Sequence, residues 1–546
     1  MTRIQGHGGA HAVAVARGYG VETMFTLSGG HVFPLYDGAV KADPPMRILD
    51  VRHEQTAVFA AEATAKLTRT PGFAVLTAGP GVTNGLSAVA SAHFNGSPIV
   101  VFGGRAPLSN WGKGALQEID QPPLLAPITK WARTAPDTAG IAAAVDEAFR
   151  VATSPHRGPV FLDAYMDHLF DQAEVEIPVP GAAGAAAGGS ARSSGGAENV
   201  ARLLAAAERP VLVVGSDVWT DGAEVAARSA AEELRLPVIT NGMGRGVLPR
   251  GHELLVTRAR SMAFAQADLV IVAGTPLDFR LGYGHFAGGA AKVAHVVDAP
   301  EQVATHLDLG GSYAGDLTAF FTALASSGGG GKWDEWLAAL AGTAAAAAAK
   351  DGELLAADAD PIHPMRIYGE LNRLLADDAV VIGDGGDFVS YAGKYVEPVR
   401  PGRWLDPGPY GCLGTGLGYA IAARLADPSA QVVLLMGDGA AGFSLMDADT
   451  LVRHGLPVVM ICGNNGIWGL EKHPMRFLYG YDVAADLQPQ CRYDEVVRAL
   501  GGAGELVTRP GDIGPALRRA FDAGVPYLVN IATDPAVAYP RATTGI

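Results

Sequence analysis

Cysteine is the rarest residue in this chain of 546 residues, which contains only Cys412, Cys462 and Cys491. Their spacing matches no metal-ligand pattern, and three cysteines cannot build the disulfide framework typical of small secreted domains. A cysteine-based zinc site and a disulfide-stapled scaffold are therefore excluded as organising features. So few thiols are typical of proteins in a reducing compartment, and we expect a cytoplasmic location.

Long apolar runs and an excess of positive charge are also absent. No segment reaches the roughly 18 consecutive apolar residues that a membrane helix needs, and the first residues do not form an apolar signal core. The formal net charge is −15 and the sequence pI is near 5.4. Because an acidic surface repels phosphate groups, we expect neither nucleic acid nor a membrane as a partner.

The chain is rich in hydrophobic residues, 49%, against 18% charged residues. Its length exceeds what one hydrophobic core supports, so several domains are expected. Gly, Ala and Ser dominate residues 181–197, which we interpret as a linker. Residues 327–332 and the alanine run 344–349 mark a second boundary, although the alanine run is also compatible with a solvated helix. The predicted domains are 1–178, 197–326 and 361–546.

Each predicted domain alternates short apolar runs with segments of helical periodicity, which is the pattern of parallel α/β sheets. We therefore expect an α/β fold with three consecutive doubly wound parallel-sheet domains. Helices are expected over 55–67 and 443–454. The expected strands are 23–27, 48–51, 73–77, 99–102 and 160–162, then 210–215, 237–239, 268–273 and 293–298, then 380–382, 432–436, 456–462 and 527–531.

Two polar motifs follow neighbouring apolar runs in the third domain. Gly437-Asp438-Gly439 comes after 432–436, and Asn464-Asn465 comes after 456–462. Parallel strands bring their carboxyl ends to one edge, where ligands bind. Asp438, the amide oxygen of Asn465 and a carbonyl near Ile467 are hard oxygen donors that suit Mg²⁺. Gly437, Gly439 and Ala440 allow backbone N–H groups to approach a diphosphate.

Gly-Asp-Gly followed at this spacing by Asn-Asn resembles the thiamine-diphosphate-binding signature. A second resemblance lies in the first domain, where Arg52-His53-Glu54 and the stretch Thr77–Gly85, with Gly79 and Asn84, are similar to the pyrimidine-binding domain of the acetolactate synthase group. This resemblance implies pyrimidine-binding, middle nucleotide-binding-like and diphosphate-binding domains, in that order. It also implies that Glu54 bonds the aminopyrimidine of the cofactor and promotes its activation, which requires a carboxyl able to share a proton in an apolar pocket.

Further positions follow from the same resemblance. Gln117 matches a glutamine that faces the substrate. In the stretch 411–420 a bulky apolar residue holds the cofactor in its bent shape, and Leu417 is the expected residue, with Leu413 as the competing choice. Arg280 matches an arginine that pairs with the carboxylate of the second substrate, since a guanidinium and a carboxylate form bidentate bonds.

The resemblance implies an acetolactate synthase that decarboxylates pyruvate and joins the product to a second 2-keto acid, as in branched-chain amino acid biosynthesis. It further implies FAD in the middle domain, a homodimer or homotetramer, and in some members a small regulatory subunit. Arg258-Ala259-Arg260-Ser261 is instead similar to the ADP-binding domain of 2-hydroxyacyl-CoA lyases and oxalyl-CoA decarboxylases. A carbon–carbon lyase acting on acyl-CoA is therefore the alternative, with ADP in place of FAD. A protein that binds the cofactor without catalysing a reaction is disfavoured, because such a protein has no chemical need for Glu54.

Overall fold

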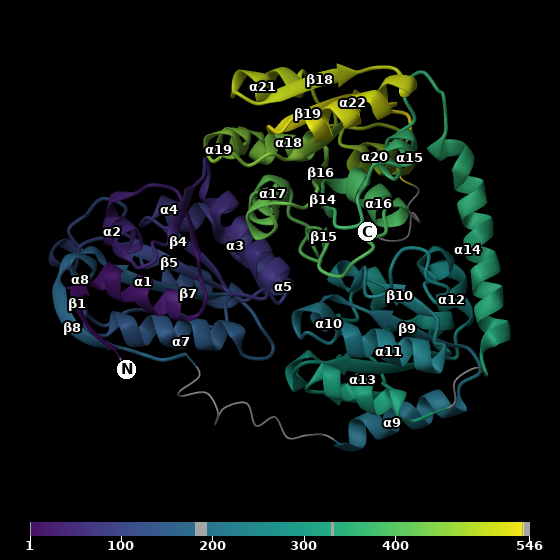
Figure 1. The fold of residues 1–546 in the computed structure, drawn as a ribbon, viewed down its shortest axis with the longest axis horizontal. Helices are drawn as coiled ribbons and strands as arrows, with labels where there is room; N and C mark the ends of the chain where they lie inside the picture. The colour runs from purple at the N-terminus through teal and green to yellow at the C-terminus, as the bar shows by residue number, and fades with distance from the viewer. Residues whose placement is uncertain (1, 181–193, 329–331, 538, 540–546) are drawn as a thin grey trace.

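The computed structural model describes residues 2–180, 194–328, 332–537 and 539. It contains three parallel sheets, each flanked by helices, and a small antiparallel pair (Figure 1). The predicted fold class, three consecutive parallel-sheet α/β domains, is confirmed. Within the described residues no helix is both long and apolar enough to cross a membrane.

The first sheet has the strand order β3-β2-β4-β5-β7-β6. Its side chains alternate between two cores, as the pleat requires: Phe73 and Val75 of β4 pack under α1 and α7, whereas Ala74 and Leu76 face α3. The strands are β2 (Thr23–Thr26), β3 (Arg47–Asp50), β4 (Gly72–Leu76), β5 (Ile99–Arg105), β6 (Ala132–Thr134) and β7 (Val160–Tyr165). The helices are α1 (Gly8–Gly18), α2 (Phe33–Lys41), α3 (Glu54–Thr68), α4 (Pro80–Asn84), α5 (Leu86–Phe94), α6 (Pro122–Leu125), α7 (Ile141–Thr153) and α8 (Met166–Phe170).

Several elements of this domain were not predicted. β1 (Thr2–His7) and β8 (Gln172–Ile177) form the antiparallel pair, which joins the two ends of the domain. Polar residues alternate with apolar ones in both strands, and much of the pair is exposed, so neither strand has the apolar run that identifies a buried strand. The short edge strand β6 lacks such a run for the same reason.

The middle sheet has five strands in the order β10-β9-β11-β12-β13. They are β9 (Pro210–Val214), β10 (Val238–Thr240), β11 (Leu269–Ala273), β12 (Lys292–Val297) and β13 (Gly311–Ala314). The helices are α9 (Ser194–Ala206), α10 (Ser216–Thr220), α11 (Glu224–Leu234), α12 (Arg260–Gln266) and α13 (Leu317–Ala325). Because α9 begins at Ser194, the linker prediction is wrong for residues 194–197, and residues 181–193 lie outside the described residues.

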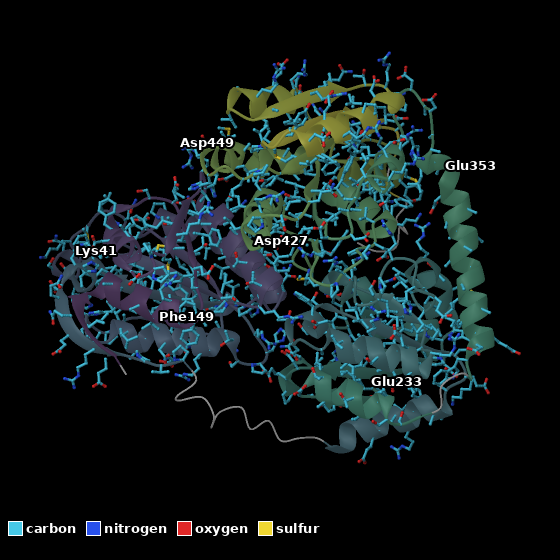
Figure 2. The ribbon with its side chains drawn as sticks, in the orientation of Figure 1. Lys41, Phe149, Glu233, Glu353, Asp427 and Asp449 are labelled. Atoms are coloured by element: carbon cyan, nitrogen blue, oxygen red, sulfur yellow. The ribbon has the colours of Figure 1, made fainter. Side chains whose placement is uncertain are left out.

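A long helix, α14 (Asp334–Leu355), connects the middle domain to the third and runs along the side of the molecule (Figure 1). The alanine run 344–349 lies inside it, so the alternative interpretation of that run as a solvated helix is confirmed. Side chains are sparse along this helix in Figure 2, where Glu353 is labelled near its end.

The third sheet has the strand order β15-β14-β16-β17-β19-β18, which repeats the order of the first sheet strand for strand. Its strands are β14 (Val380–Asp384), β15 (Trp404–Leu405), β16 (Val432–Gly437), β17 (Val459–Asn464), β18 (Ala503–Val507) and β19 (Tyr527–Ala532). The helices are α15 (Met365–Leu371), α16 (Gly386–Tyr395), α17 (Thr415–Ala426), α18 (Asp438–Ser444), α19 (Ala448–Arg453), α20 (Gly469–Tyr479), α21 (Tyr493–Ala499) and α22 (Pro510–Asp522).

The helix predicted over 443–454 is wrong in its bounds. The structure has α18, a 3₁₀ turn over Leu445–Asp447 and α19 in succession. Ser444 breaks the helix, because its φ of −140° and ψ of 1° lie outside the helical region. The break places Asp447 at the start of α19, where it contacts the first domain.

The first and third domains share one hydrophobic core. Helices α3 and α17 lie side by side (Figure 1), and Phe59 packs edge-on against Tyr419 with ring centroids 6.0 Å apart. Gly418 makes this approach possible, because a Cβ there would lie 2.7 Å from the Phe59 Cβ. The glycine therefore sets the distance between the two domains.

Candidate active site

The third sheet opens at its carboxyl edge into a cavity of about 470 Å³, called here the catalytic cavity. The strand order reverses between β14 and β16, and doubly wound sheets bind ligands at such a switch point. Asn464 does not line this cavity, whereas all the residues predicted to bind the metal or the diphosphate do: Gly437, Asp438, Gly439, Ala440, Asn465 and Ile467. The two motifs are thus brought together as their positions after β16 and β17 predict.

Asp438 is the most buried of the candidate metal ligands, with 3% of its surface exposed. Its Oδ1 accepts the N–H of Gly439 over 3.0 Å, and its Oδ2 accepts the N–H of Gly466 over 2.7 Å. Burial raises the pKa of Asp438 to about 6, against these backbone hydrogen bonds, which lower it. Asn465 lines the same cavity, and its amide oxygen accepts the N–H of Ile467 over 3.2 Å. Carboxylate and amide oxygens are hard donors of the kind that a divalent cation binds.

Trp468 was not predicted as a site residue, yet it shapes the same cavity. A Cβ on Gly439 would lie 2.4 Å from the indole ring, so the ring excludes any side chain at that position. The ring also meets Phe443 edge-on, with centroids 6.5 Å apart. Nothing in the sequence distinguished this tryptophan from an ordinary packing residue.

The structure separates the two leucines that competed for the position beneath the cofactor. Leu417 is fully buried in the core of the first and third domains, in the first turn of α17, and is not among the residues lining the catalytic cavity. Leu413 precedes the helix and lines the cavity together with Gly411 and Cys412. Leu413, and not Leu417, therefore lies at the wall of the catalytic cavity, while the contact of either leucine with the cofactor stays a prediction.

The site residues predicted in the first domain gather at the carboxyl edge of its own sheet. Glu54 opens α3, directly after β3, and is 6% exposed. Asn84 donates to its Oε2 over 3.0 Å. Gly79 has a φ of +60°, and a Cβ there would lie 2.8 Å from the carbonyl oxygen of Gln117. Glu54, Gly79, Asn84 and Gln117 therefore form one group, although not the group that lines the catalytic cavity.

A buried glutamine that the sequence did not reveal holds this first-domain group in place. Gln121 accepts the N–H of Gly79 over 2.9 Å and donates to Asp163 over 2.8 Å. Asp163 is in turn paired with Arg105 at 3.0 Å. Because these partners come from four separate segments of the domain, no local pattern identifies them.

Comparison with known proteins assigns the family. Family models for the thiamine pyrophosphate enzymes match in succession: the N-terminal TPP binding domain at residues 7–124, the central domain at 197–324 and the C-terminal TPP binding domain at 384–531. The acetolactate synthase large subunit IlvG of Mycobacterium tuberculosis is 50% identical over 536 residues, which cover 98% of this chain and 97% of that protein. The chain belongs to the thiamine pyrophosphate enzyme family.

Other relatives carry two different activities in their names. A probable acetolactate synthase of Mycobacterium bovis is also 50% identical, over 98% of this chain and 97% of its own length. The 2-hydroxyacyl-CoA lyase 2 of Homo sapiens is 34% identical, over 96% of this chain and 90% of its own length. The full-length matches place all three domains of this thiamine pyrophosphate enzyme within the family.

The central domain of this family member contributes Arg280 to the catalytic cavity. Arg280 also lines a second cavity of about 580 Å³, called here the interdomain cavity, where the first, middle and third domains meet. Thr275 and Ser216, at the carboxyl edge of the middle sheet, line that cavity together with Lys130 and His156 of the first domain. Arg280 is therefore shared between the two cavities.

The arginines that resemble an ADP-binding motif are engaged by the protein itself. Arg258 is paired with Asp351 and donates to the carbonyl oxygen of Lys394 over 3.0 Å. Arg260 donates to the carbonyl oxygen of Arg280. Neither arginine lines the interdomain cavity, so in this family member both join segments of the chain.

Proposed function

We propose that this chain is a thiamine-diphosphate-dependent acetolactate synthase, which decarboxylates pyruvate and joins the resulting two-carbon unit to a second 2-keto acid. The observation that carries the proposal is the catalytic cavity, in which Asp438, Asn465 and Ile467 lie together with Arg280. The proposed metal ligands and a guanidinium that can bind a substrate carboxylate thus line one cavity. The acetolactate synthase relatives, at 50% identity, support the same activity.

In this proposal Mg²⁺ is held by the carboxylate of Asp438, the amide oxygen of Asn465 and the carbonyl of Ile467. Gly437, Gly439 and Ala440 at the start of α18 bind the diphosphate through backbone N–H groups. Leu413 would contact the cofactor from the wall of the cavity. When bound, thiamine diphosphate supplies the electron sink for loss of CO₂, and the protein supplies position and electrostatics.

Glu54 is assigned the proton chemistry at the aminopyrimidine, with Gly79, Asn84 and Gln117 around it. These residues lie at a different sheet edge from the catalytic cavity of the same chain, so we propose that a second copy brings them there. Exposed apolar side chains beside the two edges support such an interface, because free apolar surface is costly in water: Leu116 is 78% exposed, Phe443 52% and Met446 54%. A homodimer is the smallest assembly that completes two sites, and a homotetramer satisfies the same requirement.

Arg280 is proposed to bind the carboxylate of the acceptor. A keto acid offers two carboxylate oxygens to the guanidinium fork, whereas an acyl-CoA thioester offers none. This difference favours the synthase over a 2-hydroxyacyl-CoA lyase. The lyase is the second candidate, on the strength of relatives that are 34% identical over most of the chain.

We propose that the interdomain cavity takes the adenine nucleotide of the middle domain, as FAD or as ADP. Its volume of about 580 Å³ accommodates a nucleotide, and Lys130, Arg157 and the hydroxyls of Ser216 and Thr275 are suitable partners for phosphate and ribose. The absorbance spectrum of the purified protein tests the choice. A flavin band supports FAD, and ADP released on denaturation supports the nucleotide of the lyases.

Turnover tests the proposed function. Purified protein with Mg²⁺, thiamine diphosphate and FAD is expected to convert pyruvate to acetolactate, detected after acid conversion to acetoin. Glu54→Gln is expected to lower that rate by about 100-fold and to slow deuterium exchange at C2 of the cofactor. Glu22→Gln, on the surface of the same domain, is the control. Release of formyl-CoA from a 2-hydroxyacyl-CoA, without acetolactate from pyruvate, would identify the lyase instead.

A further inference from the structure

Arg280 is held by a single carboxylate, that of Asp278. Its Nε lies 3.1 Å from Oδ1 and 3.0 Å from Oδ2, and its Nη2 lies 2.7 Å from Oδ2. The same carboxylate accepts the backbone N–H of Arg280 over 2.9 Å, so Asp278 caps the 3₁₀ turn Phe279–Gly284 and orients the side chain within it. Each of the two side chains is only 22% exposed, and together they form one bonded pair.

The neighbouring charges bear on how the guanidinium is held. Arg260 donates to the Arg280 carbonyl oxygen, and the positive charge of Arg280 contributes, after burial and Arg245, to the lowered pKa of Arg260. The positive charge of Arg260 therefore lies close to Arg280, on the side of the Arg280 backbone. Asp406, another carboxylate of the catalytic cavity, is already bonded to Trp404 over 2.7 Å and to the N–H of Gly408 over 2.9 Å.

The position of the pair decides what Arg280 offers to a ligand. Asp278 lines only the interdomain cavity, whereas Arg280 lines both cavities. Asp278 uses the Nε and Nη2 edge of the guanidinium, and within the described part of the chain Nη1 forms no hydrogen bond. An arginine has five N–H donors, so the edge that Asp278 leaves unused is sufficient for a second carboxylate.

We propose that Asp278 is a positioning residue that holds Arg280 between the two cavities and thereby makes the site selective for acceptors with a carboxylate. This inference rests on the proposed function, because it concerns the second substrate of that reaction. Asp278 itself does not touch the acceptor. Without it, Arg280 is repelled by Arg260 and samples several side-chain conformations, and the acceptor carboxylate must then order it.

A competition assay separates selectivity from the amount of active enzyme. Pyruvate is the donor, and the enzyme is offered a 2-keto acid and an uncharged aldehyde, benzaldehyde, as acceptors at the same time. The ratio of the two condensation products gives the preference directly. For Asp278→Asn we expect that preference to shift about tenfold toward the aldehyde, the size of effect typical of one charge-assisted hydrogen bond.

The matched control is Asp316→Asn. Asp316 caps α13 of the same domain by accepting the N–H of Ala319 over 3.0 Å, as Asp278 caps its own turn, and it lines neither cavity. Its product ratio should equal that of the wild type. In an Arg280→Ala background, where the preference is already lost, Asp278→Asn should produce no further shift, because it acts through Arg280.

Two results would overturn the inference while leaving the proposed function intact. One is a wild-type product ratio in Asp278→Asn. The other is a full additional shift when Asp278→Asn is combined with Arg280→Ala. Failure of the wild type to form acetolactate from pyruvate is a different outcome, which refutes the proposed function and the acceptor selectivity together.

Discussion

Thr56 donates its hydroxyl hydrogen to Asp447 over 2.6 Å, and this bond joins the first domain to the third within one chain. The N–H of Arg52 donates to the other oxygen of the same carboxylate over 2.8 Å. Glu54 lies between these two donors, at the first turn of α3. The third domain therefore fixes the backbone that presents the proposed proton-transfer residue.

Asp447→Ala is expected to lower the free energy of unfolding by about 3 kcal/mol, because it leaves the Arg52 N–H and the hydroxyls of Thr56 and Thr450 without an acceptor in a buried place. Urea denaturation followed by circular dichroism measures the change. Asp512→Ala removes an exposed pair with Arg509 and should cost less than about 1 kcal/mol. Equal losses in the two variants would contradict the role given to Asp447.

Asp438→Asn tests the metal site through ligand-dependent stability. Mg²⁺ with thiamine diphosphate at 100 times its Kd should stabilise the wild type by about 2.7 kcal/mol and raise its Tm. The variant should lose that increase. Without ligands it should also be somewhat less stable than the wild type, because the Asn side chain has a single acceptor oxygen and leaves the N–H of Gly439 or of Gly466 without its partner. Asp377→Asn, on the surface, should keep the full increase. If Asp438→Asn also kept the ligand-induced increase in stability, the proposed metal site would be contradicted.

Gly418→Ala tests the close packing of α3 on α17. The added methyl group would lie 2.7 Å from the Phe59 Cβ and 2.9 Å from the Thr56 carbonyl oxygen, so we expect a loss of about 1–3 kcal/mol in unfolding free energy. Gly442→Ala in α18 meets nothing within 4 Å and should be neutral or stabilising by about 0.5–1 kcal/mol. Chemical denaturation of both variants gives the comparison. A neutral Gly418→Ala would mean that the two helices adjust freely.

The interdomain cavity predicts a pH dependence of stability. Burial alone would lower the pKa of His156, but a 2.9 Å hydrogen bond to Asp298 and the charges of Asp217 and Asp298 raise it to about 9. The unfolded value is about 6.5, so the protonated ring stabilises the fold fully below about pH 6.5, and this stabilisation is lost as the pH rises through about 9. The charge of Lys130 opposes protonation of the ring in part, although burial lowers the pKa of Lys130 itself to about 8. Arg157 lies 3.9 Å from Asp298, and burial raises the pKa of Asp217 to about 7.

His156→Gln isolates this contribution. Its unfolding free energy should lie about 2–3 kcal/mol below that of the wild type at pH 7, and the two should converge near pH 10. Urea denaturation at pH 7, 8, 9 and 10 measures the difference. A difference that stays constant over this range would show that the ring contributes as a neutral hydrogen-bonding group.

The motifs that the sequence reveals are those whose partners follow neighbouring strands. Asp438 and Asn465 could be predicted to meet, because each follows a buried apolar run, and adjacent parallel strands end at one edge. Leu417 and Leu413 are four positions apart across the start of α17. Periodicity does not determine on which side of a helix start the cavity lies, and only the structure shows that Leu417 faces the core.

The residues that the sequence did not reveal act over long separations. Gln121 bonds Gly79, Asp163 bonds Arg105, and Asp447 bonds Thr56 across a domain boundary. No local spacing encodes such pairs. Strands β15 and β18 were not predicted for a different reason. β15 has only two residues, and most residues of β18 are partly exposed, so neither forms a continuous buried run.

The repeated strand order of the first and third sheets has a consequence for how the molecule works. Each chain carries two versions of one scaffold. On the proposed function they bind opposite ends of the same coenzyme, yet within one chain the predicted site residues of the first domain do not line the catalytic cavity of the third. If two chains pair as proposed, only the assembled pair forms a complete catalytic site. Specific activity should then decline on dilution while every separated chain keeps its secondary structure.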